Sequence, residues 1–308
     1  MSIAIIGSAN MDIAARAADL PVPGQTILAD SCETGPGGKG CNQAIAVHRL
    51  GAKTRLIAKI GDDTMGKNLL AALQHEGLDT DHIIQGTDIQ TGIALITVDR
   101  KGENMITVAG GANMTLTRQD IRNHYDFLSG CTCLLVQLEC PVVAIASALK
   151  YAREEGIATI LDPSPVLDRV VMRDLIALAD IITPNSSECA ALTGIIPKDA
   201  ATAQQAADIL HEMGCPTVII KMGALGAWYS APDGNGKIAP FQVVPVDTVA
   251  AGDCFNAGLA VALKNGNDLA KAVRFACAAG ALATTEFGAA SSAPYLHQVE
   301  TLLNNSHA

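Results

Sequence analysis

The stretch Val246-Asp-Thr-Val-Ala-Ala-Gly-Asp-Cys-Phe-Asn-Ala-Gly258 combines small residues, an acid and the start of an apolar helical run. A helix that begins near Ala251 would direct the free N–H groups of Ala251, Gly252 and Asp253 outward, where the helix dipole favours an anion. Gly252 has no Cβ, so a phosphate can approach the backbone there. The carboxylate of Asp253 could then take a proton from an alcohol while the amides hold the phosphoryl group. Alternatively, Asp253 is only the N-cap of the helix.

The composition indicates a globular enzyme. The chain has 308 residues, of which 49% are hydrophobic and 17% charged, and it contains 28 glycines. A net charge of −10 argues against nucleic-acid binding, which normally needs a basic face. There is no basic leader and no apolar span of membrane length, so we expect no membrane association and a cytoplasmic location. Nine cysteines without a C-x-x-C pair fit free thiols in a reducing compartment, not a zinc site.

Short apolar runs alternate with amphipathic helical patterns along the chain. This alternation predicts a mostly parallel central sheet with helices on both faces, in a single α/β domain over residues 1–308. Ligands of such sheets bind beyond the carboxyl ends of the strands. The predicted strands are Ile3–Gly7, Arg55–Ile60, Cys133–Leu138, Ala158–Leu161, Ile181–Thr183 and Thr217–Lys221. The predicted helices are Cys41–Leu50, Met65–Glu76, Val142–Glu155, Ala203–Met213, Phe255–Leu263 and Leu269–Thr284.

Two segments depart from this alternation. Residues 13–34 lack helical periodicity and contain Pro21, Pro23 and Gly24, which indicates extended chain and turns. Within residues 90–109, the runs Gln90–Val98 and Asn104–Ala109 are joined by Asp99–Glu103, which is typical of a β-hairpin. The two segments together predict a small β-sheet beside the main one that serves as a lid or a dimer surface.

Two polar motifs lie near the N-terminus, one before a predicted helix and one after the first predicted strand. Gly35-Pro-Gly-Gly-Lys-Gly-Cys-Asn42 lies before a helix, and its glycines permit close backbone approach while Lys39 and Asn42 supply donors. A simple glycine-rich turn is the alternative. Asn10 and Asp12 follow the first strand, and an amide with a carboxylate can match vicinal sugar hydroxyls. An ordinary Asx turn is the alternative there.

Two further motifs suit a nucleotide. Asn185 and Glu188 follow a predicted strand and can share one helix face, where they suit a hydrated Mg²⁺ near phosphate oxygens or, alternatively, form a helix cap. The segment Lys221-Met-Gly-Ala-Leu-Gly226 leaves another strand and could lie along nucleotide phosphates or form a hairpin turn. The spacing of the earlier segment Gly35–Asn42 is not that of a P-loop, and no G-x-G-x-x-G motif of the Rossmann type opens a βαβ unit near the N-terminus.

The order of these pieces resembles the ribokinase-like family, also called the pfkB carbohydrate kinases. The resemblance rests on Gly37–Asn42 (Gly-Gly-Lys-Gly-x-Asn) and Asp247–Phe255 (Asp-Thr-x-x-Ala-Gly-Asp-x-Phe), about 200 residues apart. It covers nearly the whole chain. It implies ATP-dependent phosphorylation of the primary 5-hydroxyl of D-ribose or a close pentose, with Asp253 as general base and residues 251–253 as the anion hole. Another small alcohol, such as deoxyribose, another sugar or a nucleoside, is the alternative substrate.

The resemblance also implies a role for individual residues. The positions that match the family's sugar pocket are Asn10, Asp12, Gly38, Lys39, Asn42, Glu139 and Asp253. Those that match nucleotide-side positions are Asn185, Lys221, Gly223, Gly226, Gly252 and Cys277, with Glu188 holding Mg²⁺ through water. The positions that match a monovalent-cation (K⁺) site are Asp247, Val249, Ala283, Glu286, Gly288 and Ser292. Lys221 departs from the family's usual small hydroxyl residue, and Thr285–Phe287 departs from a more basic loop.

The same resemblance implies a homodimer that forms through the lid, with ATP and a sugar as small-molecule partners. Open strand edges and the apolar side chains of Ile93, Leu95 and Ile106 would be exposed in a monomer. A symmetric dimer would cover them. Ala94 and Ile106 would then help to cover the bound sugar.

Overall fold

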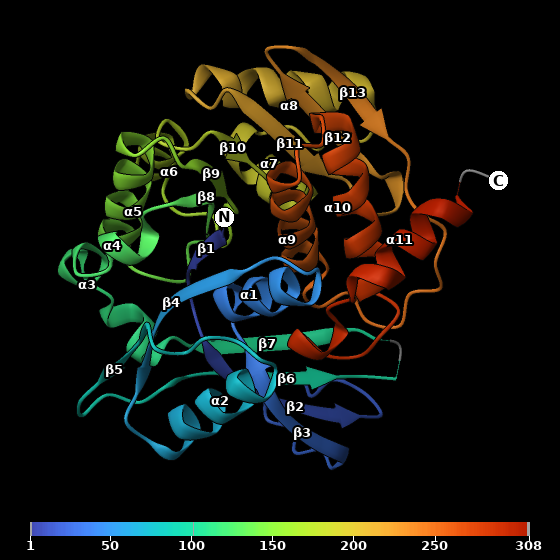
Figure 1. Ribbon diagram of the computed structural model, residues 1–308. Helices are drawn as coiled ribbons and strands as arrows, with labels where there is room; N and C mark the ends of the chain where they lie inside the picture. The colour runs from blue at the N-terminus through green and yellow to red at the C-terminus, as the bar shows by residue number, and fades with distance from the viewer. Residues whose placement is uncertain (1, 101, 307–308) are drawn as a thin grey trace.

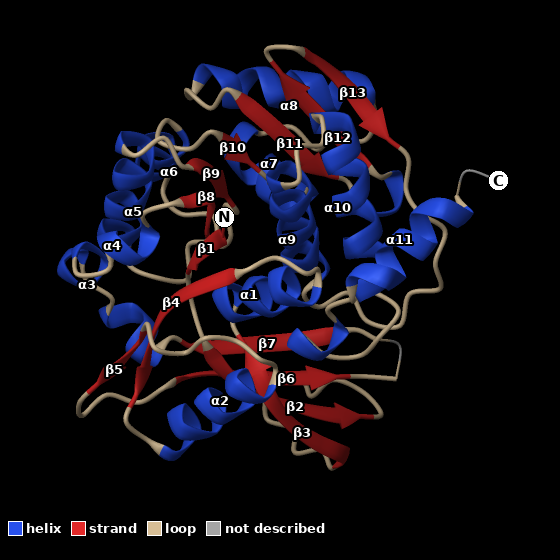
Figure 2. Cartoon of the chain, viewed as in Figure 1, coloured by secondary structure: helices blue, strands red, loops and turns tan. Residues whose placement is uncertain are grey.

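The computed structural model describes residues 2–100 and 102–306 of the chain. It contains two β-sheets, a large one surrounded by helices and a small one that lies below it in the view of Figures 1 and 2. The strand β1 lies inside the large sheet, between β8 and β4.

The large sheet has nine strands in the order β13-β12-β11-β10-β9-β8-β1-β4-β5. All neighbours pair in parallel except β11–β12 and β12–β13, which are antiparallel. The expected mostly parallel sheet is therefore confirmed, and β5, β12 and β13 extend it. Its strands are β1 Ser2–Ile6, β4 Thr54–Gly61, β5 Ile83–Gly86, β8 Cys131–Val136, β9 Ala158–Leu161, β10 Ile181–Ile182, β11 Thr217–Lys221, β12 Ala227–Ala231 and β13 Gly234–Ile238.

Helices cover both faces of this sheet, as Figure 2 shows. Successive residues of a strand point to opposite faces, and β1 shows the result: Ile3 and Ile5 belong to one apolar core, Ala4 and Ile6 to the other. The helices are α1 Lys39–Arg49, α2 Thr64–His75, α3 Arg118–Arg122, α4 Tyr125–Leu128, α5 Val142–Glu154, α6 Arg169–Ile176, α7 Ser186–Thr193, α8 Ala200–Glu212, α9 Ala251–Lys264, α10 Leu269–Ala283 and α11 Leu296–Asn305.

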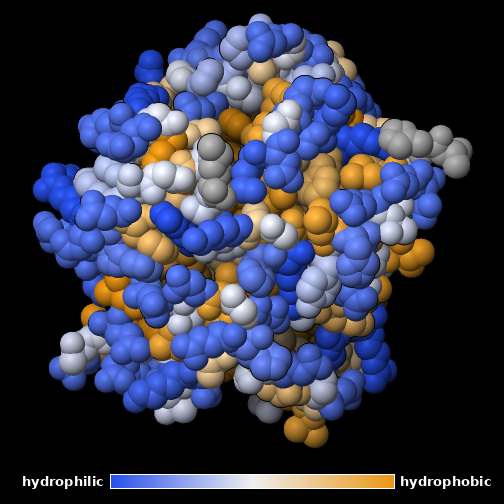
Figure 3. All heavy atoms as spheres, in the orientation of Figure 1, coloured by the Kyte–Doolittle hydropathy of each residue, from blue (hydrophilic) through white to orange (hydrophobic). Residues whose placement is uncertain are grey.

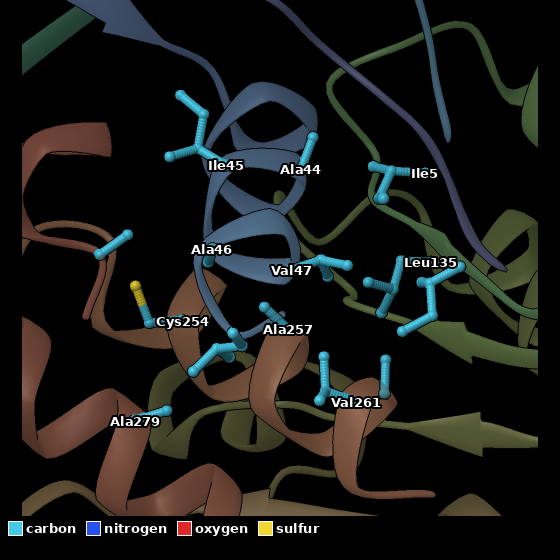
Figure 4. Close-up of a cluster of buried hydrophobic side chains, with 14 of the residues drawn as sticks. Ile5, Ala44, Ile45, Ala46, Val47, Leu135, Cys254, Ala257, Val261 and Ala279 are labelled. Carbon is cyan, nitrogen blue, oxygen red and sulfur yellow. The ribbon is translucent and has the colours of Figure 1, made fainter. Parts of the chain in front are cut away.

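The packing of α1 against α9 brings two distant sequence motifs together. Figure 4 shows Val47 of α1 near Ala257 and Val261 of α9, in a cluster that also includes Ile5 and Leu135 of the sheet. Because many of the α1 and α9 contact residues are small, the two helices can approach closely. This contact places the glycine-rich motif before α1 beside the first turn of α9.

The small sheet has four strands in the order β3-β2-β6-β7. Its strands are β2 Asn10–Ala17, β3 Ala29–Gly37, β6 Gly92–Val98 and β7 Asn104–Ala109. The predicted hairpin is confirmed as β6 and β7, although Lys101 in its turn lies outside the described residues. The alternative that Asn10 and Asp12 form an ordinary Asx turn after the first strand is wrong, because both lie on β2.

Apolar side chains are exposed on the small sheet. Leu95, Met105, Ile106 and Val108 are each about half exposed, whereas Ile93 is half-buried. The face of the molecule in Figure 3 is mostly hydrophilic, with apolar patches between the polar side chains. Among the described residues, no helix is both long and apolar enough to cross a membrane.

Candidate active site

Asp253 lies in the first turn of α9 and is almost fully buried, with 3% of its surface exposed. It is not the N-cap, because Ala250 takes that position with a left-handed φ of 59°. This conformation costs a residue with a Cβ about 1–2 kcal/mol. Such strain is often retained where a turn must present the backbone to a ligand. The alternative that Asp253 only caps the helix is therefore wrong.

The carboxylate of Asp253 is held by two side-chain amides from α1. Asn42 Nδ2 donates to Oδ2 at 3.1 Å, and Gln43 Nε2 donates to Oδ1 at 3.0 Å. Burial raises the pKa of Asp253, while Lys39 and the two hydrogen bonds act in the opposite direction. A buried carboxylate with a raised pKa accepts a proton more readily than one in water, which is what a general base requires.

The backbone before Asp253 supplies anion-binding groups. Within the described residues, the N–H groups of Gly252 and Asp253 have no hydrogen-bond acceptor, and both residues line a cleft of about 800 Å³. The N–H of Ala251 instead donates to the carbonyl of Thr248 over a long 3.4 Å. The first turn of α9 thus offers two free amides to an anion, with Ala251 less available than the sequence suggested.

The cleft brings together all the residues predicted for the nucleotide side: Asn185, Glu188, Lys221, Gly223, Gly226, Gly252 and Cys277. Lys39 and Asp253, which were predicted for the sugar pocket, also line it. The segment Lys221–Gly226 is both a turn between the antiparallel strands β11 and β12 and part of the cleft wall. The two alternatives for this segment are therefore compatible.

Asn185 and Glu188 form a reciprocal helix cap at the start of α7. The backbone N–H of Asn185 donates to Glu188 Oε2 at 2.7 Å, and that of Glu188 donates to Asn185 Oδ1 at 2.9 Å. Both residues also line the cleft. Burial raises the pKa of Glu188, and Asp162 adds to this effect while Lys221 and Lys39 oppose it. The described residues contain no cluster of three or more acidic, histidine or cysteine side chains suited to a metal ion, so phosphate and water would have to complete any Mg²⁺ shell here.

A second group of polar residues, from β2, α1 and the segment after β8, lies near Asp253. Asn10 of β2 is buried, and its Oδ1 accepts from Asn113 Nδ2 at 2.7 Å. Glu139 follows β8 and accepts hydrogen bonds from the Ser8 hydroxyl and from the backbone N–H of Lys39. In this group, Asp12 Oδ1 and Asn42 Oδ1 are buried without a hydrogen-bond partner. Such atoms are costly unless a ligand satisfies them.

Glycine makes room for the carboxylate of Asp12. A Cβ on Gly37 would lie about 2.0 Å from that carboxylate, which is closer than atoms can approach. Burial raises the pKa of Asp12 to about 7, and the negative charges of Glu139 and Asp253 contribute. Asp12 thus lies within electrostatic range of Asp253, although it sits on the small sheet and Asp253 on a helix of the large one.

Lys39 connects the two groups. It lies at the start of α1 after Gly38, whose φ of 83° suits glycine, and it lines the cleft. Burial alone would lower the pKa of Lys39, but the carboxylates of Asp253, Asp162 and Glu139 outweigh burial and raise it. Lys39 therefore keeps a positive charge in the middle of the site.

The residues predicted for a monovalent cation lie in two adjoining loops beside α9. Buried Asp247 accepts hydrogen bonds from the N–H of Val249 at 3.0 Å and from the N–H of Gly288 at 3.1 Å. The Ser292 hydroxyl donates to the carbonyl of Ala289 at 2.8 Å, and the N–H of Glu286 donates to the carbonyl of Ala283 at 3.5 Å. Asp247 thus joins the loop before α9 to the loop after α10, and carboxylate and carbonyl oxygens suit a hard cation.

Four polar residues of the site were not predicted from the sequence: Gln43, Asn113, Gln137 and Asp162. Gln43 contacts Asp253, and Asp162 forms an ion pair with Lys221. Gln43 directly follows the predicted Asn42, so a second amide side chain beside a predicted site residue was a signal for it. Asp162 follows the strand Ala158–Leu161, and its place at a carboxyl end could have indicated it.

Comparisons with known proteins identify the family. The chain matches the family described as pfkB family carbohydrate kinase over residues 1–296. It is 38% identical to a ribokinase of Haemophilus influenzae over 100% of this chain and 99% of that protein, and 31% identical to a deoxyribokinase of Salmonella typhi over 99% of each. The structure of Arabidopsis thaliana ribokinase complexed with ribose and ATP superposes with a TM-score of 0.87, at 30% identity and over 98% of each chain. This chain therefore belongs to the pfkB family of carbohydrate kinases.

Proposed function

We propose that this protein uses ATP to phosphorylate the primary 5-hydroxyl of D-ribose or a close pentose. The observation that carries the proposal is the position of Asp253 between two different binding regions. It lines the cleft with the free amide of Gly252, and it accepts a hydrogen bond from Asn42, whose own Oδ1 is buried and unpartnered. The base thus adjoins both an anion site and a set of unsatisfied hydroxyl-binding groups. The ribokinase and deoxyribokinase relatives support a pentose.

In this proposal, the sugar binds among Asn10, Asp12, Asn42 and Glu139, beside Gly38 and Lys39. Asp12 Oδ1 and Asn42 Oδ1 accept hydrogen bonds from sugar hydroxyls, which removes the cost of leaving them buried and unpaired. The 5-hydroxyl then lies against Asp253. Its proton passes to the Asp253 carboxylate as the oxygen attacks the γ-phosphorus of ATP. The bond between that phosphorus and the oxygen that bridges it to the β-phosphate breaks, and ADP leaves.

The nucleotide occupies the cleft with its phosphates toward the first turn of α9. The N–H groups of Gly252 and Asp253, with that of Ala251 at the edge, stabilise the negative charge of the transferring phosphoryl group. Gly223, Gly226 and Cys277 form the adjoining wall. Mg²⁺ bound through water near Glu188 and Asn185 would neutralise phosphate charge. A K⁺ ion held by Asp247 and the carbonyl groups of the two loops would keep the start of α9 in place.

The small sheet is proposed as a lid within one domain and as the surface of a homodimer. Asp12 pairs with Ala94 across β2 and β6, and Ile96 pairs with Ile106 across β6 and β7. Since residues two apart share a face, Asp12, Ala94, Ile96 and Ile106 lie on one side of the sheet. That side can cover a sugar bound at Asp12 and exclude water. The cytoplasm remains the expected compartment, and all nine cysteines are free thiols.

A coupled ADP-release assay over a panel of pentoses, hexoses and nucleosides tests the proposal. The expected result is ATP-dependent turnover with kcat/KM highest for D-ribose or 2-deoxyribose. Turnover that is highest for a hexose or a nucleoside would overturn the proposed substrate. The residues 13–34 and 90–109 contain no aromatic side chain that could stack on a nucleobase, which argues against a nucleoside.

A further inference from the structure

The cleft contains an ion pair, Lys221–Asp162, that has no part in the proposed base or anion hole. Lys221 Nζ lies 3.1 Å from Asp162 Oδ1, with 12% of the lysine side chain and 3% of the aspartate side chain exposed. Lys221 ends β11, Asp162 follows β9, and both residues line the cleft. Ion pairs that are this buried contribute little to stability on average, since desolvation offsets the attraction. The place of this pair on the cleft wall favours a role in ligand binding.

Asp162 links this lysine to the proposed base. Its second oxygen, Oδ2, accepts a long hydrogen bond of 3.4 Å from Gln43 Nε2, and the same nitrogen donates to Asp253 Oδ1 at 3.0 Å. Gln137 Nε2 in turn donates to Gln43 Oε1 at 2.6 Å, which fixes the orientation of the Gln43 amide. Lys221, Asp162, Gln43 and Asp253 thus form a continuous chain of buried polar contacts.

Lys221 is also close to the free amide of the anion hole. Its Nζ lies 3.4 Å from the position that a Cβ on Gly252 would occupy. A lysine ammonium has three N–H donors, and Asp162 is its only recorded hydrogen-bond acceptor among the described residues. Two donors therefore remain beside Gly252, on the wall of a cleft that an anionic ligand would enter.

We propose that Lys221 binds the terminal phosphates of the nucleotide during transfer, and that Asp162 is a positioning residue that holds the ammonium beside Gly252. The ligand class, a nucleoside triphosphate, rests on the proposed function. Gln43 aligns Asp162 with Asp253, so the phosphate-binding cation and the base are held by one network. Lys221 forms no covalent bond; it offsets the charge on the phosphate oxygens.

Replacing Lys221 and Asp162 singly and together distinguishes a role in phosphate binding from a purely structural role. When Lys221 is replaced by an uncharged residue, Asp162 becomes a buried carboxylate without its cation, close to Asp253 and to the incoming phosphates. The variant therefore loses an attraction and gains a repulsion. Replacing Asp162 by Asn in the same protein removes the repulsion, so the double variant should bind ATP better than the lysine variant alone.

The experiment compares wild type, Lys221→Met, Asp162→Asn and the double variant by calorimetric titration with ATP, ADP, AMP and adenosine, with Mg²⁺ present and no sugar. We expect Lys221→Met to weaken ATP binding about tenfold or more, to weaken ADP binding less, and to leave AMP and adenosine unchanged. The double variant should recover part of the ATP affinity. If Lys221→Met proves unfolded in a thermal melt, Lys221→Gln, which keeps a donor and a similar length, replaces it in both variants.

The matched control removes the exposed ion pair Lys67–Asp62, whose Nζ–Oδ1 distance is also 3.1 Å, through Lys67→Met and Asp62→Asn. We expect no change in the affinity for any of the four ligands. An equal loss for adenosine and ATP in Lys221→Met, or a double variant as weak as Lys221→Met, would overturn the proposal. A wild-type protein that binds ATP but phosphorylates no sugar of the panel would overturn the proposed function and leave the role of Lys221 standing.

Discussion

The two halves of the site differ in how their polar groups are satisfied. On the sugar side, Asp12 Oδ1 and Asn42 Oδ1 are buried without partners. On the nucleotide side, Lys221 is paired with Asp162, and Asn185 with Glu188. The sugar side therefore bears its desolvation cost before a ligand arrives, whereas the nucleotide side keeps these side-chain pairs and offers the free N–H groups of Gly252 and Asp253 to phosphate. This difference predicts that the affinity for the sugar depends on a few side chains, while the affinity for the nucleotide is shared among backbone N–H groups and charged side chains.

The largest effect on one half alone is expected for Asp12→Ala. A sugar hydroxyl would lose its buried acceptor, at a cost of about 1–3 kcal/mol. The KM for the sugar should therefore rise about 5- to 150-fold, while the KM for ATP changes little. Steady-state kinetics with each substrate varied in turn provide the measurement. A larger rise in the KM for ATP than for the sugar would place Asp12 in the other half of the site.

The pH dependence of sugar binding gives a second, smaller effect. Burial and the neighbouring acids raise the pKa of Asp12 to about 7 from an ordinary 3.8. Only the ionised carboxylate accepts hydrogen bonds with both oxygens, so the KM for the sugar should fall as the pH rises from 6 to 8. In Asp12→Asn, which cannot ionise, this fall should disappear. An unchanged pH profile in that variant would show that another group titrates.

The raised pKa of Asp12 also makes the stability of the fold depend on pH. Between pH 3.8 and about 7, folded Asp12 binds a proton that the unfolded chain has released, so this contribution to stability is lost as the pH rises through about 7. Asp12→Asn should therefore raise the melting temperature of the sugar-free protein relative to wild type more at pH 8 than at pH 5. Thermal melts at the two pH values measure the difference.

How much of this site could be predicted depended on the type of signal. Helices and parallel strands followed from apolar periodicity, and Asp253, Lys39 and Asn42 from local motifs. The strand character of Asn10 and Asp12 was missed, because the sequence of β2 shows no clear alternation of apolar and polar residues. In the structure, most residues of β2 are half-buried, so neither face of the strand is fully apolar. Asp162 and Gln43 were missed although each adjoins a predicted element, because their contacts with Lys221 and Asp253 form only where the ends of β9 and β11 meet α1 and α9.

Monovalent-cation dependence is expected to be a several-fold effect. Asp247 ties the loop before α9 to the loop at Gly288, and an ion there would order the amides of the anion hole. Activity should rise when K⁺ replaces Na⁺ or a bulky organic cation, and Asp247→Asn should reduce the response. A rate that does not depend on the cation would show that the loop with Glu286 and Phe287 forms no such site.

The smallest effect on turnover is expected at the lid surface. Leu95 is 49% exposed on β6, and Leu95→Glu should shift the protein from dimer to monomer by placing a charge in the interface. Val170→Glu, on α6 outside the lid and 71% exposed in wild type, is the matched control and should remain dimeric. Sedimentation at micromolar concentration measures both. Monomeric wild-type protein with full activity would contradict the proposed dimer.

The central claim is that the two halves of the site meet at Asp253, whose carboxylate acts on the substrates only as a base. Asp253→Asn keeps the size of the side chain but cannot accept the proton. We predict that it lowers kcat by at least about 10²–10⁴-fold, while calorimetric titration shows ribose and ATP still binding with affinities close to those of wild type. Turnover comparable to wild type in this variant would contradict the claim.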